Sequence, residues 1–279
     1  MNKILYHTLA LSYGTYFNTL AILSPRHAAK KAYQLFSTPR KGRVLPHQAP
    51  FLNKAKGKTI CVNGLDLQTY HWPGSLPTVL LMHGWESNVY RWRHLIAILQ
   101  EKNFNIIAFD APGHGYSKGN MLNLATYSDS ARQIVQHYQP QYIIGHSMGG
   151  LATLHHQYQH PETSTKKIVS LGAPAELSEL MDHYQRLLRL NKTVLRGIDQ
   201  HLFQHHRFRI KDISTPTFAK SIAVPGLIIH DKEDTITPFS ASERLHRNWK
   251  SSQLIATTGL GHSLHKEDVN KQIAAFLSA

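Results

Sequence analysis

The sequence has one cysteine, few acidic residues and no long uninterrupted hydrophobic run. Because Cys61 has no partner, the chain cannot form an internal disulfide, and no cysteine cluster is available to bind zinc. The 17 acidic residues stand against 31 lysines and arginines, so the formal net charge is +14. Hydrophobic residues nevertheless make up 42% of the 279 residues. This share excludes intrinsic disorder, because enough apolar surface is present to offset the entropy of the chain.

The sequence has an excess of positive charge but no recognised nucleic-acid-binding motif and no concentrated basic helix. We therefore expect no nucleic-acid partner. Three histidines, His201, His205 and His206, share one face of a predicted helix. No acidic residue or cysteine completes a metal-binding set with them, so we expect no metal and interpret them as a solvated surface.

The first 57 residues are predicted to form a helical extension. Leucines and tyrosines recur at helical spacing from Leu5 to Leu23, and Ser24 with Pro25 marks the start of a second helix that ends near Phe36. Polar residues interrupt the first helix and no clear cleavage site follows, so neither a secretion signal nor a membrane span is expected. We interpret the extension as packing on the main domain of a cytoplasmic protein. The alternatives are peripheral contact with an anionic membrane through the N-terminal helix, and contact with a partner protein.

From residue 58 to residue 279, short apolar runs alternate with helix-length segments. Asn63 and Gly64 separate two strand-like runs and predict a tight hairpin. Further apolar runs are expected to form strands, at 78–82, 105–109, 141–144, 167–171, 226–229 and 253–256. Such runs predict an α/β fold whose sheet is mostly parallel, is covered by helices on both faces and has the hairpin at one edge. Residues 175–223 hold no strand pattern and are predicted to form an inserted helical cap.

The segment Gly145–Gly150 carries the strongest chemical signal. Gly145, Ser147 and Gly149 form a Gly-x-Ser-x-Gly motif directly after a predicted strand and before a predicted helix. In this context the motif is typical of a nucleophile elbow, in which glycines allow a sharp turn that exposes the serine hydroxyl. The start of the following helix adds a partial positive charge where an oxyanion would form.

A serine nucleophile needs a histidine base and an acid that orients the base, and both occur later in the chain. Three carboxylates, Asp231, Glu233 and Asp234, follow one predicted strand, and His262 follows the next in a glycine-rich loop. The order serine, acid, histidine is the one expected for this geometry. Upstream, Trp85 follows the end of a strand, so that its backbone N–H can join that of Met148 in an oxyanion hole.

These motifs resemble the α/β-hydrolase superfamily from roughly Lys58 to Ala279. The resemblance is carried by His83–Trp85, Asp110–Ser117, Gly145–Gly149 and the two later loops with Asp234 and Gly261-His262. It implies an eight-stranded sheet, a helical cap between the sixth and seventh strands, and no cofactor. The family pattern aligns Asp234 with the triad acid, although Asp231 replaces its glycine and Thr237 its valine.

The resemblance and the residues together predict a serine hydrolase that cleaves a small-molecule carboxylic ester through an acyl-enzyme. Ser147 is the expected nucleophile, His262 the base and Asp234 the acid, with Trp85 and Met148 forming the oxyanion hole. A thioesterase, a lipase, a peptidase or an acyltransferase would use the same residues. An alternative of another class is a non-catalytic, membrane-associated protein that keeps the fold.

Overall fold

The computed structural model describes residues 3–161 and 164–279 and divides into two compact units. The helical unit combines the chain up to Thr38 with Glu176–Ser214. The sheet unit combines Pro39–Ala175 with Thr215–Ala279. The helical unit therefore joins the N-terminal helices with residues 176–214, which are most of the segment predicted to form a cap.

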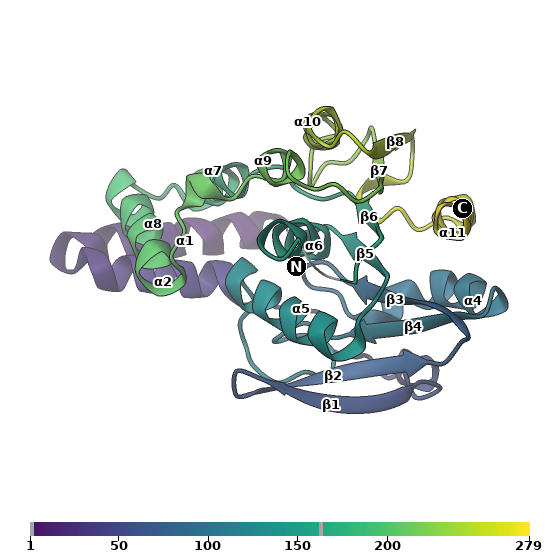
Figure 1. The fold of residues 1–279 in the computed structure, drawn as a ribbon. Coiled ribbons are helices and arrows are strands. Elements are labelled where there is room, and N and C mark those ends of the chain that lie inside the picture. Colours follow the sequence, from purple (N-terminus) through teal and green to yellow (C-terminus); the bar gives the residue numbers. More distant parts are fainter. Residues whose placement is uncertain (1–2, 162–163) are drawn as a thin grey trace. The chain divides into compact units, whose positions relative to one another are not determined.

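The sheet unit contains an eight-stranded sheet, as predicted (Figure 1). Its strands are β1 Lys56–Val62, β2 Leu65–Trp72, β3 Leu76–Met82, β4 Phe104–Phe109, β5 Tyr142–His146, β6 Lys167–Leu171, β7 Gly226–Asp231 and β8 Ser252–Thr257. Their spatial order is β1-β2-β4-β3-β5-β6-β7-β8. Strands β1 and β2 pair antiparallel, as do β2 and β4, and every other pairing is parallel. The prediction of a mostly parallel sheet with an antiparallel edge is therefore confirmed.

The hairpin between β1 and β2 has the predicted tight turn. Asn63 and Gly64 both have positive φ angles, 49° and 80°. Two successive positive φ angles define the turn type that matches the twist of the flanking strands, and asparagine and glycine tolerate them best.

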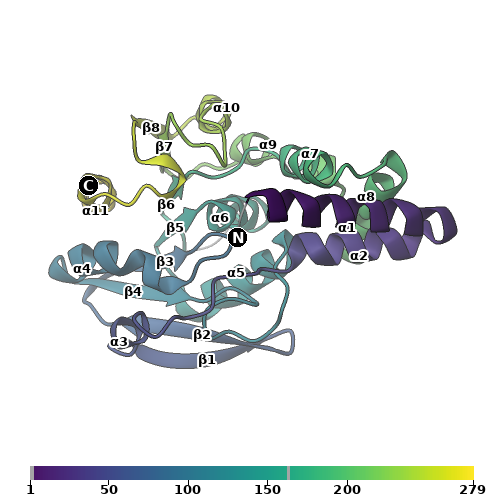
Figure 2. The same ribbon diagram turned by 180° about the vertical axis from the view of Figure 1, so that it is seen from behind.

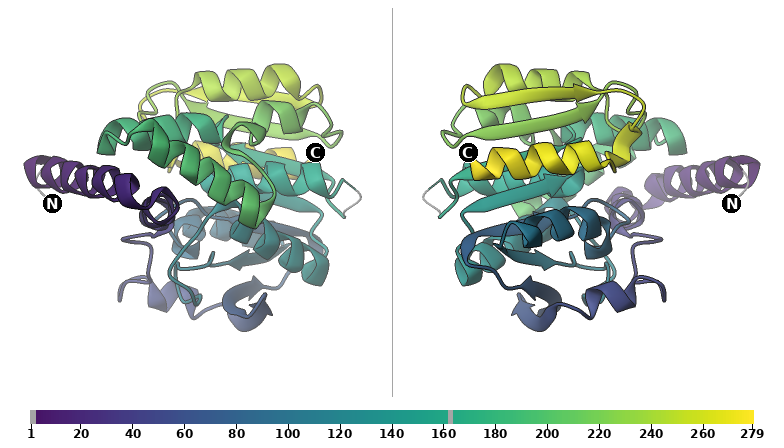
Figure 3. Two further views of the ribbon diagram at one scale, coloured as in Figure 1. Left: turned by 90° about the vertical axis from the view of Figure 1, so that its left-hand side faces the viewer. Right: turned by 90° about the vertical axis from the view of Figure 1, so that its right-hand side faces the viewer.

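Helices cover both faces of the sheet (Figure 3). One face carries α4 (Arg93–Glu101) and α11 (Glu267–Ser278), whose leucines and isoleucines pack on the buried side chains of the parallel strands. The other face carries α5 (Leu124–Tyr138), α6 (Met148–Gln159), α9 (Thr215–Ala219) and α10 (Ser240–Asn248). Short helical segments complete the unit, namely α3 Ala49–Leu52, η1 Val89–Trp92 and η3 Gly261–Ser263.

The helical unit brings together segments far apart in the sequence (Figure 2). It contains α1 (Lys3–Leu23), α2 (Pro25–Ser37), α7 (Leu177–Leu188), α8 (Lys192–His206) and the short η2 (Ile210–Asp212). None of the helices in the described part of the chain combines the length and the hydropathy that crossing a membrane requires.

Long-range hydrogen bonds join the N-terminal helices to the inserted ones. The Tyr184 hydroxyl donates to the carbonyl of Ala32 at 2.8 Å. The Asn18 side chain donates to the carbonyl of Arg189 at 2.9 Å and accepts from the backbone N–H of Asn191 at 2.8 Å. These bonds cross more than 150 residues of sequence, so the two segments form one folding unit.

Helix α1 packs through alanines, a glycine and one phenylalanine rather than through its leucines. The buried residues are Ala10, Gly14, Phe17 and Ala21, and a side chain at Gly14 would overlap the carbonyl of Leu188. The leucines and tyrosines that predict the helix lie on a different face, most of them exposed. The helix was predicted correctly, but its apolar stripe is not the face that packs.

Candidate active site

Ser147 occupies a sharp turn between β5 and α6 in the sheet unit. Its φ of 54° and ψ of −121° are unfavourable for any residue with a side chain. The backbone N–H of Ser147 donates to the carbonyl of Leu171 at 2.8 Å, which ties the turn to β6. A side chain at Gly149 would overlap the carbonyl of Met82, and one at Gly145 would press on the backbone of Gly149. The glycines of the motif thus allow the close backbone contacts that hold the serine in this conformation.

His262 reaches Ser147 from η3, the short helical turn between β8 and α11. The Ser147 hydroxyl lies 2.9 Å from His262 Nε2, within hydrogen-bonding distance. On its other side, His262 Nδ1 lies 2.7 Å from Asp234 Oδ2, and that carboxylate is the acceptor. With Nδ1 protonated, Nε2 is free to accept a proton from the serine hydroxyl.

Asp234, rather than Asp231 or Glu233, contacts this histidine. Asp231 accepts hydrogen bonds from the Thr257 hydroxyl at 2.7 Å and from the backbone of Leu260 at 3.0 Å. These contacts fasten Asp231 to the end of β8, and the Glu233 side chain is exposed. Of the three carboxylates in the loop, the structure brings only Asp234 to His262.

Two further side chains donate to Asp234. His230 Nε2 lies 3.1 Å from Asp234 Oδ2, and the Thr237 hydroxyl donates to the same oxygen at 2.8 Å. Burial by itself raises the pKa of Asp234, but hydrogen bonds from His230, His262 and the backbone of Thr237 and Ile236 outweigh it. The pKa of Asp234 therefore lies well below its ordinary value, and the carboxylate stays ionised.

Neither His230 nor Thr237 was expected to touch the acid. Thr237 also lies 3.1 Å from His262 Nδ1, so its hydroxyl sits beside the contact between the acid and the histidine. The only signal in the sequence was that threonine replaces the valine of the family pattern.

The segment after β3 lies against Ser147. A Cβ atom at Gly84 would be 3.0 Å from the Ser147 Cβ, so the backbone leading to Trp85 passes directly beside the serine. Met148 is the first residue of α6, where backbone N–H groups have no partner within the helix. Trp85 therefore follows the backbone that passes beside Ser147, and Met148 comes directly after Ser147.

His83 holds this segment in place through buried hydrogen bonds. It is fully buried, contacts the carbonyl of Gly84 at 2.8 Å and accepts from the backbone N–H of Ala111 at 2.9 Å. Burial lowers the pKa of His83 to about 4, so the imidazole is neutral. Nearby, the buried Asp110 accepts from the Tyr70 hydroxyl at 2.7 Å and from the backbone of Val89 at 3.0 Å. Its bonds lie within the scaffold, which indicates a structural role for Asp110.

His146 supports the His262 loop. Its Nε2 donates to the backbone carbonyl of His262 at 2.8 Å, and the two rings are 4.9 Å apart. Burial lowers the pKa of His146 well below its ordinary value, so the ring is a neutral support.

No group of three or more histidine, cysteine or acidic side chains in the described part of the chain is arranged to hold a metal ion. The histidines around Asp234 are each engaged with protein partners, His230 with Ser242 at 2.6 Å and His262 with Ser147. The arrangement is therefore suited to moving a proton from the serine hydroxyl to a histidine.

Comparisons with known proteins agree with the fold and the motifs. The family model described as "alpha/beta hydrolase fold" matches residues 77–210. The chain is similar to an uncharacterized hydrolase, YugF, from Bacillus subtilis, with 24% identity over 77% of this chain and 96% of that protein. It is also 24% identical to the bifunctional esterase/perhydrolase DCH of Acinetobacter calcoaceticus, over 77% of this chain and 97% of that one.

Among solved structures, an esterase from Exiguobacterium antarcticum superposes with a TM-score of 0.62. It is 20% identical, and the match covers 80% of this chain and all of the other. The chain belongs to the α/β-hydrolase superfamily. Its relatives support a hydrolase.

Proposed function

We propose that the protein is a serine hydrolase that cleaves a carboxylic ester of a small molecule through an acyl-enzyme. The observation that supports it most is the unbroken hydrogen-bonded line from Asp234 through His262 to Ser147, with distances of 2.7 and 2.9 Å. Serine is a weak nucleophile at neutral pH, and this arrangement is the one that activates it.

In the first half-reaction, His262 Nε2 takes the proton of the Ser147 hydroxyl as the serine oxygen attacks the ester carbonyl. The backbone N–H groups of Trp85 and Met148 stabilise the resulting oxyanion. As the tetrahedral intermediate collapses, the ester C–O bond breaks and His262 gives its proton to the departing alkoxide. The alcohol leaves, and the acyl group remains on the serine.

In the second half-reaction, His262 takes a proton from a water molecule that attacks the acyl-enzyme. The serine oxygen then leaves with the proton from His262, which releases the carboxylic acid and restores the enzyme. Asp234 remains ionised throughout, holds the imidazole in the tautomer with Nδ1 protonated and stabilises its cation.

Names of relatives favour an ester as the substrate. One is the esterase/perhydrolase already described, and another is a pimeloyl-[acyl-carrier protein] methyl ester esterase of Vibrio vulnificus. The latter is 31% identical over 112 residues, which cover 43% of that protein. A thioesterase, a lipase or a peptidase would use the same three side chains, so the substrate panel below includes each.

The test is hydrolysis of p-nitrophenyl esters of increasing acyl length, run beside an acyl-CoA and an aminoacyl-nitroanilide. We expect ester turnover to exceed turnover of the other two, and Ser147→Ala to lower it on the order of 10³-fold or more. Circular dichroism of the variant checks that the fold persists. Undiminished turnover in Ser147→Ala contradicts the serine mechanism, whereas preferred cleavage of the thioester or the anilide reassigns the substrate.

A further inference from the structure

The N-terminal helix presents apolar side chains to solvent in the helical unit. Leu5, Leu9, Tyr13 and Tyr16 lie on an exposed stripe, while the helix packs through a different face. The stripe runs to the end of α1, where Leu23 is 85% exposed and its neighbour Ile22 is 81% exposed. Such exposure is costly in water, and exposed apolar side chains gathered on one helix are typical of an interaction site.

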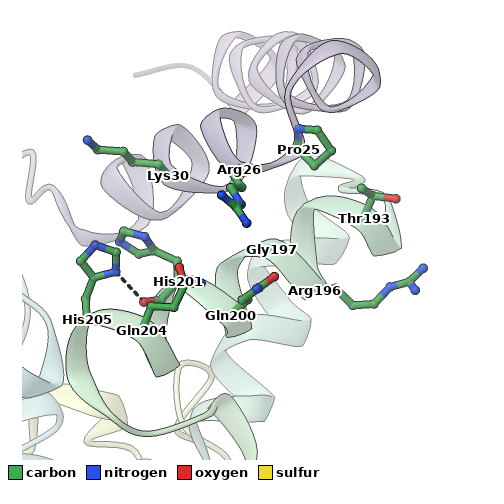
Figure 4. A pocket seen from close by; sticks show the side chains of 10 residues that line it. All are labelled: Pro25, Arg26, Lys30, Thr193, Arg196, Gly197, Gln200, His201, Gln204 and His205. Atoms are coloured by element: carbon green, nitrogen blue, oxygen red, sulfur yellow. Dashed lines mark hydrogen bonds between the residues drawn. The ribbon is translucent and has the colours of Figure 1, made fainter.

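A groove of about 440 Å³ between α2 and α8 begins beside the same turn (Figure 4). Pro25, the first residue of α2, and Thr193, near the start of α8, line one end of it. Because Leu23 is only two residues before Pro25, the exposed end of α1 and the mouth of the groove adjoin.

The groove is lined by basic and neutral polar side chains. Its polar members include Arg26, Lys30, Arg196, Gln200, His201 and His205. Figure 4 shows Arg26 reaching from α2 toward α8. No acidic side chain lines the groove, so no carboxylate within it neutralises the basic groups.

Asp199, the acidic residue nearest in sequence to the lining residues of α8, already has hydrogen-bond partners. Asp199 pairs with Arg209 at 2.7 Å and accepts from the backbone of Ile210 at 2.8 Å. No acidic residue precedes Asp66 anywhere in the chain, so α1 and α2 carry no negative side chain. Burial lowers the pKa of His201, and the neighbouring His205, His206 and Lys30 lower it further, in agreement with a cluster of positive groups.

We propose that this surface of the helical unit docks on an anionic phospholipid bilayer. Ile22, Leu23 and the stripe of α1 enter the boundary between headgroups and acyl chains, and the groove receives a headgroup phosphate at Arg26, with Arg196 adding positive charge to the same surface. A bilayer supplies an apolar phase and an anion side by side, which is the pairing that the exposed turn and the groove present. A free anion would use only the groove.

The experiment is co-sedimentation of the full chain with vesicles of phosphatidylglycerol and phosphatidylcholine, against vesicles of phosphatidylcholine alone. We expect binding to the anionic vesicles that weakens as salt is raised, because exposed charges are screened. Replacing both arginines, in Arg26→Gln/Arg196→Gln, is expected to weaken binding about tenfold or more. Ile22→Ser/Leu23→Ser is expected to weaken it to a similar degree, about tenfold.

Matched variants in the sheet unit control for loss of charge and of exposed apolar surface. Lys220→Gln/Lys250→Gln removes two exposed charges, and Leu45→Ser/Leu76→Ser replaces two exposed leucines. Both pairs are expected to bind like the unchanged protein. The proposal is overturned if either control weakens binding as much as its counterpart, or if neutral and anionic vesicles bind equally.

Two other occupants of the surface are separated by the same experiment. Inorganic phosphate at matched ionic strength is expected to compete for the groove and to weaken vesicle binding. If the full chain binds inorganic phosphate but not the anionic vesicles, the groove is a site for a free anion and the bilayer proposal is wrong. If Ile22→Ser/Leu23→Ser instead abolishes self-association measured without vesicles, the exposed turn is an interface with a second copy of the chain. Ser147→Ala is expected to bind vesicles normally, so failure of the proposed reaction and failure of docking are distinguishable.

Discussion

The two units of the chain use their polar residues in opposite ways. In the sheet unit, histidines and a carboxylate are hydrogen-bonded to one another: His230 and Asp234 are buried, and His262 is half-buried. In the helical unit, alanines and larger apolar side chains are buried between the helices, while basic side chains line a surface groove and several apolar side chains of α1 are exposed. Buried polar contacts support the proposed chemistry in the sheet unit, while the helical unit places basic side chains around a groove that no acidic side chain lines.

The largest expected effect lies within the buried network. Asp234→Asn removes the negative partner of His262, so the imidazole can adopt the wrong tautomer and its cation is no longer stabilised. We expect ester turnover to fall by up to about 10⁴-fold while the fold persists. The measurement is kcat/KM on the best ester of the panel.

Asp231→Asn is the matched control for that variant, since it changes a carboxylate three residues away. Its partners are Thr257 and Leu260 rather than His262, so we expect a loss of stability of about 1–3 kcal/mol and a change in turnover below about tenfold. If Asp231→Asn is inactive and Asp234→Asn is nearly normal, the acid has been assigned to the wrong residue.

The second expected effect is on stability in acid. Burial lowers the pKa of several histidines of the sheet unit to about 4, namely His83, His114, His155 and His156. Burial also lowers the pKa of His146 well below its ordinary value. Unfolding exposes them, and their pKa then returns to about 6.5. Between these values the unfolded chain binds more protons than the folded one, so stability is full above about pH 6.5 and falls as the pH drops toward 4. Each histidine contributes up to about 1 kcal/mol per pH unit.

Tryptophan fluorescence reports on this unit alone, because all four tryptophans of the chain, at positions 72, 85, 92 and 249, lie in it. We expect urea melts followed by fluorescence to shift to clearly lower urea between about pH 7 and about pH 5. Burial raises the pKa of Asp110, so the contribution of this carboxyl to the stability of the fold decreases as the pH rises. This effect opposes that of the histidines. Equal midpoints at the two pH values would show that the buried histidines do not govern acid stability.

The third prediction concerns packing in the helical unit. Gly14→Ala places a methyl group against the carbonyl of Leu188, so α1 must move away from α7. We expect a loss of about 1–3 kcal/mol, measured as weaker hydrogen-exchange protection of the α1 amides. Thr15→Ala, at the exposed neighbouring position, is expected to leave protection unchanged. Equal protection in both variants would mean that the close contact at Gly14 does not hold the helix.

The smallest expected effect comes from the Thr237 hydroxyl, which contacts Asp234. Thr237→Val keeps the shape of the side chain and removes the hydroxyl that donates to Asp234. We expect kcat/KM to fall about threefold to tenfold, and the effect to disappear in the Asp234→Asn background. A loss of the same size in both backgrounds would assign Thr237 a purely structural role.

Much of the sheet unit could be predicted because its signals are local. The turn at Asn63-Gly64, the apolar strands and the elbow around Ser147 each depend on residues adjacent in sequence. The packing of α1 could not be predicted in this way. Its leucines and tyrosines identify a helix, but Ala10 and Gly14 decide which face packs, and their partner is a helix more than 150 residues away.

The candidate site shows the same limit. The chain order of Ser147, Asp234 and His262 follows from motifs, and the side chains do lie within hydrogen-bonding distance. The contacts of His230 and Thr237 with Asp234 depend on how one loop folds back on itself after β7. No spacing rule indicates which way those two side chains turn.

The central claim, that Ser147 is the nucleophile of a hydrolase, is tested most directly by covalent labelling. The full chain is treated with a fluorophosphonate, and the modified peptide is identified by mass spectrometry. The account predicts one adduct per chain, located on Ser147, with ester turnover lost in proportion to labelling and no adduct in Ser147→Ala. An adduct on another residue, or full ester turnover in protein that carries no label, would contradict it.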